Sequence, residues 1–188
     1  MDVKQAIHQR RAYRSLDPVT ITEELIKDLA GSAQLSPSCF NNQPWRFVFV
    51  CDPEMLKQMH SALNKGNEWA QAASLIIAVC SSKELDCQIK GRDYYLFDTG
   101  MATAFIILRA TELGLVAHPI AGYKEDVVKA ILGIPDEMTV ITLVIVGKHS
   151  DKISPVLSEK QVGWERARPE RIPLEKFAYV NHYPEPTT

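Results

Sequence analysis

The stretch SPSCFNNQPWRFVFV, residues 36–50, passes from a polar loop directly into an apolar run. Its second half is rich in β-branched and aromatic residues, and RFVFVC at 46–51 therefore predicts a strand. Hydroxyl, thiol and amide side chains crowd the first half. Three interpretations stay open from these residues alone: Cys39 is a nucleophile, Asn41 and Gln43 bind a planar polar ligand, or the segment is an ordinary turn.

Length and composition restrict the classes of protein to consider. The 188 residues suffice for one domain with its own core. A formal charge of −2 provides no overall field that would attract nucleic acid or an anionic membrane. There is no apolar run near the ~20 residues of a membrane span, and the N-terminus lacks the apolar core of a secretory signal. We expect a cytoplasmic protein that binds neither nucleic acid nor membrane.

The cysteines and histidines form no recognisable ligand pattern. The four cysteines include no CxxC pair, and Cys51 and Cys80 end apolar runs, where cysteine acts as a small hydrophobic residue. The five histidines are scattered and include no HExxH. Neither GxGxxG nor GxxxxGK[ST] is present. We expect no disulfide framework, no metal site and no common phosphate-binding loop.

Hydrophobic periodicity predicts an alternation of helices and single strands. We expect a helix at 2–12 and a second helix that begins at a capping box formed by Thr20 and Glu23. A third helix is expected with Asp52 as its N-cap and Pro53 at its first position. The long apolar segment 93–115 predicts a central helix, with Phe97 and Phe105 among its inward residues. Strands are expected at 46–51, 74–80 and 139–147, a short helix precedes the last strand, and 116–123 is expected to be a loop. This order indicates one α+β domain.

Residues 148–188 differ from the rest of the chain. They hold five of the eleven prolines and show little periodicity, yet they contain apolar residues such as Trp164 and Phe177. We expect an extended arm without elements of its own, because a disordered tail would not need these apolar side chains. The chain then divides into a core at 1–147 and an arm at 148–188 that packs on a partner subunit.

Three polar groups could bind a ligand. In QRRAYR, Arg10 and Arg14 share one face if the segment is helical and could hold a dianion, although a solvated basic helix end is the more common reason for such a short basic run. In HPIAG at 118–122, small residues would let backbone N–H groups approach a ring closely. Arg168 and Arg171 in the tail would otherwise be surface charges.

Taken together, QRRAYR, SPSCFNNQPWRF, the long helix, PIAG and RIPLE resemble the FMN-dependent nitroreductase family, over nearly the whole chain from Arg10 to about Phe177. The resemblance implies a three-layer α/β/α sandwich with a mixed, mainly antiparallel sheet, in an intertwined homodimer with a single domain per chain. It implies tightly bound FMN, and NAD(P)H as co-substrate. The implied cofactor-binding residues are Arg10, Arg11, Ala12, Arg14, Pro37, Ser38, Cys39, Asn41, Gln43, Pro119, Ile120, Ala121, Gly122, Arg168 and Arg171.

The resemblance also implies roles for these groups. The arginines would hold the FMN phosphate and ribityl chain, and the 37–43 residues would reach the flavin from the other subunit or frame its ring. Ala12 and Cys39 stand where serine is common in the family, and Asn64, Lys65 and Asn67 are further candidates for flavin contacts. The implied activity is hydride transfer from NAD(P)H and reduction of a small nitroaromatic, quinone or enone-like acceptor by a ping-pong mechanism, with no catalytic side chain. The alternatives are a flavin-binding sensor or carrier and a cysteine-dependent enzyme at Cys39.

Overall fold

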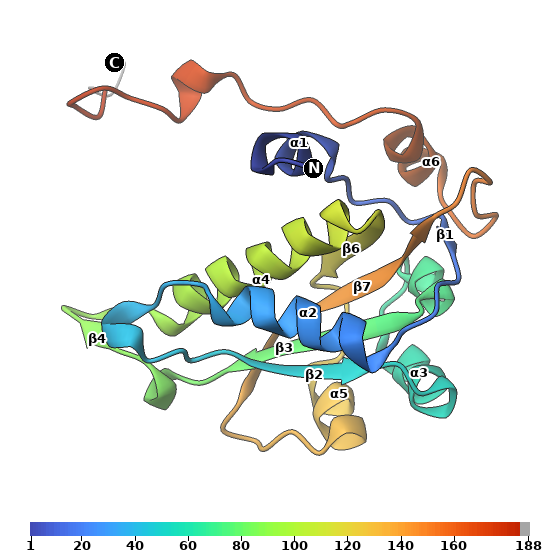
Figure 1. Cartoon of the computed structure of the whole chain (residues 1–188), viewed down its shortest axis with the longest axis horizontal. Helices are drawn as coiled ribbons and strands as arrows, with labels where there is room; N and C mark the ends of the chain where they lie inside the picture. Colours follow the sequence, from blue (N-terminus) through green and yellow to red (C-terminus); the bar gives the residue numbers. More distant parts are fainter. Residues whose placement is uncertain (185–188) are drawn as a thin grey trace.

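The computed structural model describes residues 1–184 and is built around one antiparallel sheet (Figure 1). The long strand β7 (Thr139–His149) lies at its centre and pairs with β3 (Leu75–Ser81), β6 (Leu115–Ile120) and the short β1 (Leu16–Asp17). β2 (Arg46–Val50) pairs with β3 and continues the sheet. A separate hairpin is formed by β4 (Gln88–Ile89) and β5 (Arg92–Asp93).

Alternate side chains of the two central strands point to two separate apolar cores. Every residue of β3 is buried, because helices cover both faces of the sheet. Ile76 and Ile145 belong to the core on one side, and Ile77 and Val144 to the core on the other. The uninterrupted apolar runs in these strands therefore reflect a sheet that is buried on both sides.

Helices form the outer two layers (Figure 1). α2 (Glu23–Gln34) and α4 (Tyr95–Glu112) cover one face, and α1 (Val3–Gln9) packs on α4. α3 (Pro53–Met59) and α5 (Glu125–Leu132) supply side chains to the other core. The predicted three-layer α+β sandwich is confirmed. Short 3₁₀ segments are η1 (Cys39–Asn41), η2 (His60–Ala62), η3 (Glu68–Ala72), η4 (Lys83–Leu85) and η5 (Leu174–Lys176).

The predicted inward face of α4 is wrong. Phe97 is 62% and Phe105 38% exposed in the single chain, whereas the buried positions include the small residues Ala102 and Ala110. The small side chains on this face let α4 approach the sheet and α2 closely. One apolar face of α4 is consequently left on the surface of the protomer.

Three other expectations differ from the structure. α2 begins two residues later than predicted, because Thr22, not Thr20, accepts a hydrogen bond from a backbone N–H at the helix start. Residues 115–120 form strand β6 instead of a loop, since β7 is long enough to pair with a further strand. The tail contains α6 (Glu159–Arg166), capped by a Ser158–Gln161 capping box. The Asp52–Pro53 start of α3 is confirmed.

After α6 the chain runs as an extended arm across the top of the molecule, past α1 (Figure 1). Its apolar side chains are exposed: Ile172, Leu174, Phe177 and Val180 all show more than half of their surface, and Val180 shows 86%. The last part of the predicted arm, residues 185–188, lies outside the described residues. Within the described part of the chain no helix is long and apolar enough to cross a membrane.

Candidate functional site

A pocket of about 250 Å³ lies where the chain leaves α1 and passes beneath the tail. The fold brings five arginines together here, three from the segment after α1 and two from the arm, although more than 150 residues separate the two segments. The lining residues are Arg10, Arg11, Ala12, Arg14, Trp164, Arg168, Pro169 and Arg171. All five arginine positions predicted for a cofactor phosphate therefore line one pocket.

Positive charge in this pocket is not neutralised by the chain itself. Burial lowers the pKa of Arg10, and the neighbouring Arg168 and Arg171 lower it further. Among the described residues neither Arg10 nor Arg171 has a carboxylate ion-pair partner. Arg168 is fixed by donating to the backbone carbonyls of His8 and Arg10, at 2.6 and 2.8 Å. Like charges held together in this way favour the binding of an anion.

Two of the arginines are held from the side of α6. Arg11 donates to the carbonyl oxygens of Trp164 and Glu165, at 2.6 and 3.2 Å, near the C-terminal end of the helix, where a cation is favoured. The Arg14 guanidinium lies over the rings of Trp69 and Trp164, 5.7 and 5.1 Å from their centroids. These contacts fix the segment on which the pocket is built.

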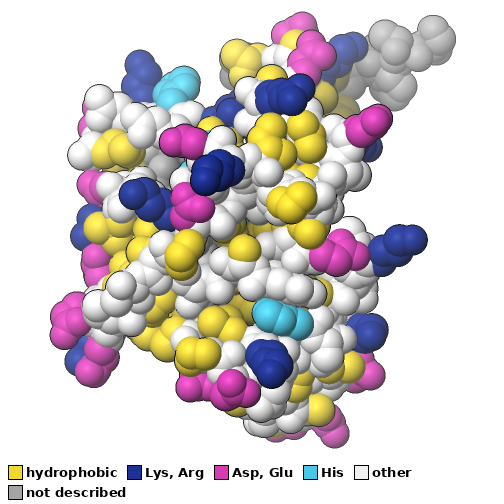
Figure 2. All heavy atoms as spheres, turned by 90° about the vertical axis from the view of Figure 1, so that its right-hand side faces the viewer, with side chains coloured by type: hydrophobic (Ala, Val, Ile, Leu, Met, Phe, Trp, Pro, Cys, Tyr) yellow, Lys and Arg dark blue, Asp and Glu magenta, His cyan; other side chains and the backbone are white. Residues whose placement is uncertain are grey.

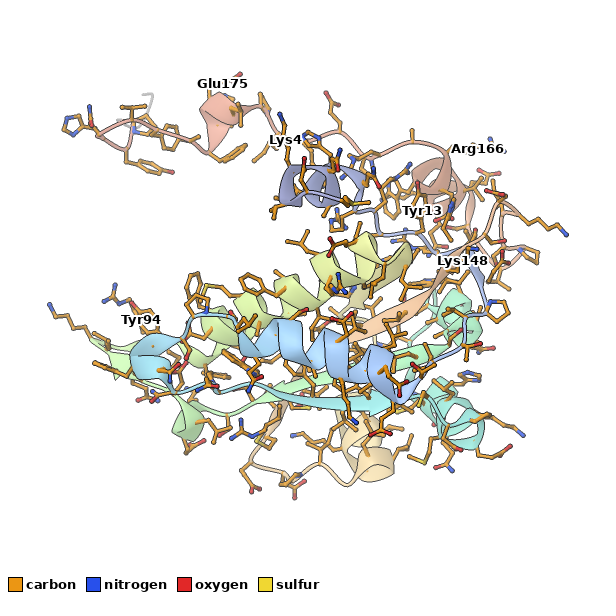
Figure 3. The ribbon with its side chains drawn as sticks, viewed as in Figure 1. Lys4, Tyr13, Tyr94, Lys148, Arg166 and Glu175 are labelled. Atoms are coloured by element: carbon orange, nitrogen blue, oxygen red, sulfur yellow. A yellow bond between two sulfur atoms is a disulfide. The ribbon has the colours of Figure 1, made fainter. Side chains whose placement is uncertain are left out.

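Glu165 anchors the backbone of the same segment. Its buried carboxylate accepts hydrogen bonds from the N–H groups of Arg14 and Ser15, at 2.7 and 3.1 Å. Burial lowers the pKa of Arg14, and Glu165 counteracts this effect. Charge-assisted bonds to backbone N–H groups hold the chain rigidly, so α6 and the arginine segment form one unit. Figure 3 shows Tyr13 and Arg166, from these two parts of the chain, at the same end of the molecule.

The predicted ring-contacting residues follow the buried part of β6. Pro119 and Ile120 end the strand, and Ala121 and Gly122 form the loop after it. The Gly122 carbonyl accepts from the Asn64 N–H at 3.0 Å and from Asn67 Nδ2 at 2.9 Å. A Cβ on Gly122 would lie 2.3 Å from Asn67 Nδ2, so glycine is needed here for close packing. The structure thereby places the 64–67 candidates beside the predicted ring loop.

The 64–67 segment also connects the ring loop to the arginine pocket. Gln161 of α6 donates to the Gly66 carbonyl at 2.9 Å. Trp69, which follows in η3, stacks on His118 with ring centroids 4.7 Å apart, and Arg14 lies on the same indole. The arginine segment, the 64–67 segment and the 119–122 loop are thus linked by direct contacts. Figure 2 views this side of the molecule and shows acidic and basic side chains interspersed over it.

The polar loop 36–43 lies at the opposite end of α4. The Cys39 N–H donates to Asp98 in the first turn of α4, at 2.6 Å, whereas the N-terminal amine before α1 pairs with Glu112 at the other end, at 3.9 Å. α4 has 18 residues and is about 27 Å long. Figure 3 shows the same separation, with Tyr94 beside the β4 hairpin and Tyr13 far from it. One chain does not bring the two predicted groups together.

Loop 36–43 has an unusual backbone. Phe40, Asn41 and Gln43 have φ of 49°, 59° and 51°, in the left-handed region that residues other than glycine rarely adopt. The Gln43 N–H donates to Ser38 Oγ at 2.9 Å, which closes the loop, and Phe40 is 83% exposed. Pro37 is also exposed. The conformation presents Asn41 and Gln43 on the surface without burying them.

The expectation that the chain has no disulfide is wrong. Cys39 is bonded to Cys87, which precedes the β4 hairpin. Their spacing of 48 residues carries no sequence signal, because the pairing depends on loop 36–43 meeting the segment before the β4 hairpin in the folded chain. A nucleophilic role for the Cys39 thiol is incompatible with this bond, since the sulfur has no free thiolate.

Comparisons with known proteins agree with the fold. The model of the Nitroreductase family matches residues 7–74 and 55–148. The chain is 33% identical over 175 residues to an Archaeoglobus fulgidus protein provisionally named NADH dehydrogenase/NAD(P)H nitroreductase, with 91% of this chain and 96% of the relative covered. The chain belongs to the nitroreductase family.

Solved structures of nitroreductase-like proteins have the same fold. An oxidoreductase described as containing FMN superposes with a TM-score of 0.83 at 28% identity, over 98% of this chain and 94% of that one. A nitroreductase family protein from Clostridium novyi NT superposes with a TM-score of 0.75 at 26% identity, over 80% and 87% of the two chains. These matches extend over the strands and helices that form both predicted groups.

Several residues that shape the site in this nitroreductase-family chain were missed from the sequence. Trp69, Trp164 and Glu165 hold the arginine segment, but each is a lone residue in a region without periodicity. The capping box at Ser158 and Gln161 was the available signal for α6, and it would have placed Trp164 and Glu165 on a helix.

Proposed function

We propose that this chain is a homodimeric FMN-dependent oxidoreductase that takes a hydride from NAD(P)H and reduces a small electron acceptor by a ping-pong mechanism. Nitroaromatics, quinones and enones are the acceptor classes that we expect. The observation that carries the proposal is the pocket of uncompensated arginines next to a glycine-containing loop. The names of the relatives, an NAD(P)H nitroreductase and an oxidoreductase containing FMN, agree with it.

The arginine pocket suits a phosphate monoester. Arg10 and Arg171 have unused donors, and guanidinium groups can bind phosphate oxygens in pairs. Arg11 and Arg168 already donate to backbone carbonyls, so they contribute charge and shape more than new hydrogen bonds. The like-charge repulsion that lowers the pKa of Arg10 would be relieved by a dianion. Arg10 and Arg171 are therefore the residues that would bind the FMN phosphate directly.

The isoalloxazine ring would be held by Arg14 and by the 119–122 loop. The absence of a side chain at Gly122 leaves the 121–122 backbone closely packed on Asn67, which keeps the loop rigid. Arg14 is held between two indoles, so its charge stays in place to stabilise the reduced, anionic ring. When bound, FMN supplies the chemistry by accepting a hydride and passing two electrons to the acceptor.

No ionisable side chain of this pocket is suited to acid–base work near neutral pH. Burial lowers the pKa of His118 to about 4, so the imidazole is neutral at pH 7. Glu165 is committed to two backbone N–H groups. The residues would bind and orient the cofactor and exclude water, and substrate protons would come from solvent.

A homodimer would complete the site. Loop 36–43 contacts the first turn of α4, a helix about 27 Å long, whereas the chain start before α1 contacts its last turn, so the loop would reach a flavin at the arginine pocket only on a second copy. The exposed apolar face of α4, with Leu96, Phe97 and Phe105, and the exposed apolar arm provide surface for such a dimer. The arm would then pack on the partner subunit.

Purification and anaerobic reduction test the enzymatic proposal. We expect yellow protein that bleaches with NADH or NADPH under anaerobic conditions and regains its colour on addition of a nitroaromatic or quinone. Colour without bleaching would favour a flavin-binding sensor or carrier. Protein that does not take up FMN would contradict both functions.

A charge placed on the α4 face tests the dimer separately. Phe97→Glu should give a monomer in sedimentation velocity and should release FMN, because the predicted interface and the loop of the partner are lost together. Ala130→Glu, on the exposed face of α5 in the opposite helical layer, is the control and should remain dimeric. A Phe97→Glu protein that stays dimeric and retains FMN would refute this interface.

A further inference from the structure

Two cysteines far apart in the sequence meet at the end of the molecule away from the arginine pocket. Cys39 begins η1, Cys87 precedes the exposed β4 hairpin, and their sulfurs are bonded with the Cα atoms 6.3 Å apart. Both residues are half-buried, so a small reagent can reach this region. The two other cysteines, Cys51 and Cys80, are not bonded.

A pair of carboxyl groups holds the backbone on both sides of this bond. Asp98 Oδ2 accepts from the Cys39 N–H at 2.6 Å, and Asp86 Oδ1 accepts from the Cys87 N–H at 2.8 Å. The two carboxyls also face each other, and an Asp86 oxygen lies within 4.8 Å of both sulfurs. Burial raises the pKa of Asp98, which is 2% exposed. The hydrogen bond from the Cys39 N–H lowers this pKa, and the neighbouring Asp86 raises it.

These contacts would keep the cysteines together after the bond opens. Asp98 accepts from the Cys39 N–H, and the Asp86 carboxyl beside Cys87 faces Asp98; neither contact involves a sulfur, so both can persist when the S–S bond opens. Asn42 adds a contact by donating to Asp86 at 3.3 Å. Two thiols held close together re-form a disulfide easily, because their effective concentration is high. The arrangement is therefore suited to reversible opening.

The bond also restrains an unfavourable loop conformation. Phe40 and Asn41, directly after Cys39, and Gln43 have positive φ, and such a backbone persists only where surrounding contacts hold it. The apolar cores, by contrast, lie on the two faces of the sheet and include neither Cys39 nor Cys87. A chain of this size does not need a disulfide to build its core. The bond acts on the loop more than on the fold.

We infer that Cys39 and Cys87 form a reversible dithiol–disulfide site that exchanges electrons with a dithiol and thereby controls the conformation of loop 36–43. A thiolate of the external dithiol attacks one sulfur, the S–S bond breaks, and the departing cysteine thiolate takes up a proton. The second thiol of the reductant then displaces the other cysteine. Two electrons and two protons pass to Cys39 and Cys87, and the reductant leaves as a disulfide.

The change in the conformation of loop 36–43 would connect the disulfide to the cofactor, and this step rests on the proposed function. If loop 36–43 contacts the flavin of a partner subunit, reduction of the disulfide should weaken that contact. The exchange reaction itself requires no flavin, so it can be measured in protein with or without FMN. Failure of the proposed function would leave the thiol measurements unaffected.

Thiol counting and equilibration with dithiothreitol test the exchange. After treatment with oxidised dithiothreitol, alkylation of unfolded protein should label two cysteines, and after native-state reduction it should label four, with one two-electron transition between them. Cys39→Ser should abolish the transition, and Cys51→Ser, the control, should leave it unchanged. Four free thiols after oxidation, a bond that opens only on unfolding, or a zinc ion retained by the reduced protein would overturn the inference.

Two further measurements test the carboxyl pair and the loop. Asp86→Ala should lower the equilibrium constant for disulfide formation about tenfold, because it removes the carboxyl that accepts from Asn42 in the loop and faces Asp98. Asp93→Ala is the control in the same hairpin, where Asp93 pairs with Lys83. Hydrogen exchange of the amides in 36–45 should become faster on reduction, while β3 stays protected. Identical exchange in both states would refute the effect on the loop.

Discussion

The buried imidazole of His118 should make the protein lose stability as the pH falls. His118 lies on β6, is 6% exposed, and stacks on Trp69. Its Nδ1 lies 3.0 Å from the Tyr13 carbonyl, which can only accept, so Nδ1 carries a hydrogen. Burial lowers its pKa from the ordinary 6.5 to about 4; the Tyr13 carbonyl opposes this and Arg14 adds to it.

The sign and size of the effect follow from these two pKa values. Below pH 6.5 the unfolded chain binds a proton at this histidine while the folded chain does not, so protons favour the unfolded state. The loss begins as the pH falls through 6.5 and is complete below about pH 4, where it reaches about 3 kcal/mol. About 2 kcal/mol of this is lost between pH 7 and pH 5.

The assay compares the free energy of unfolding by urea at pH 7 and pH 5 in the wild type and in His118→Asn. Asparagine retains an N–H donor for the Tyr13 carbonyl but does not titrate, so the variant should lose about 2 kcal/mol less between the two pH values. His182→Gln, at an exposed position in the arm, is the control and should behave as the wild type does. Equal losses in all three proteins, or an imidazole resonance that titrates above pH 6 in the folded protein, would refute the reasoning.

Two further substitutions test the pocket and the ring loop. Arg10→Ala should weaken FMN binding about tenfold to a hundredfold, because it removes a charge-assisted contact. Arg166→Ala, outside the pocket, is the control and should leave the affinity for FMN unchanged. Fluorescence titration with FMN measures both affinities, and equal values would contradict the phosphate assignment. Gly122→Ala should lower the free energy of unfolding by about 1 kcal/mol, because the new Cβ displaces the Asn67 side chain from its hydrogen bond. The same substitution in an Asn67→Ala background should cost almost nothing, and an equal cost in both backgrounds would show that Asn67 is not the obstacle.

Local patterns in the sequence were sufficient for the elements that bury apolar residues regularly. β3 and β7 are continuous apolar runs, and the Asp52–Pro53 pair starts a helix through contacts within one turn. The arginine motif and its partner residues in the tail were identified through the family resemblance, and the structure assembles them in one pocket. These features depend on residues that are neighbours in the chain, or on short contiguous motifs that can be identified directly in the sequence.

What the sequence by itself determined is the class of fold, the arginines and loops that form the candidate site, and most strands of the sheet. Only the tertiary structure decided which face of α4 is buried, that β6 is a strand, and that Cys39 bonds Cys87. An apolar helix can bury any of its faces, and the choice depends on the small residues that fit against the sheet. The stretch from Ser36 to Gln43 likewise gains its strained backbone from contacts with Asp98 and Cys87, which lie far along the chain. These features depend on packing between residues that are far apart in the sequence, and no local sequence pattern encodes such packing.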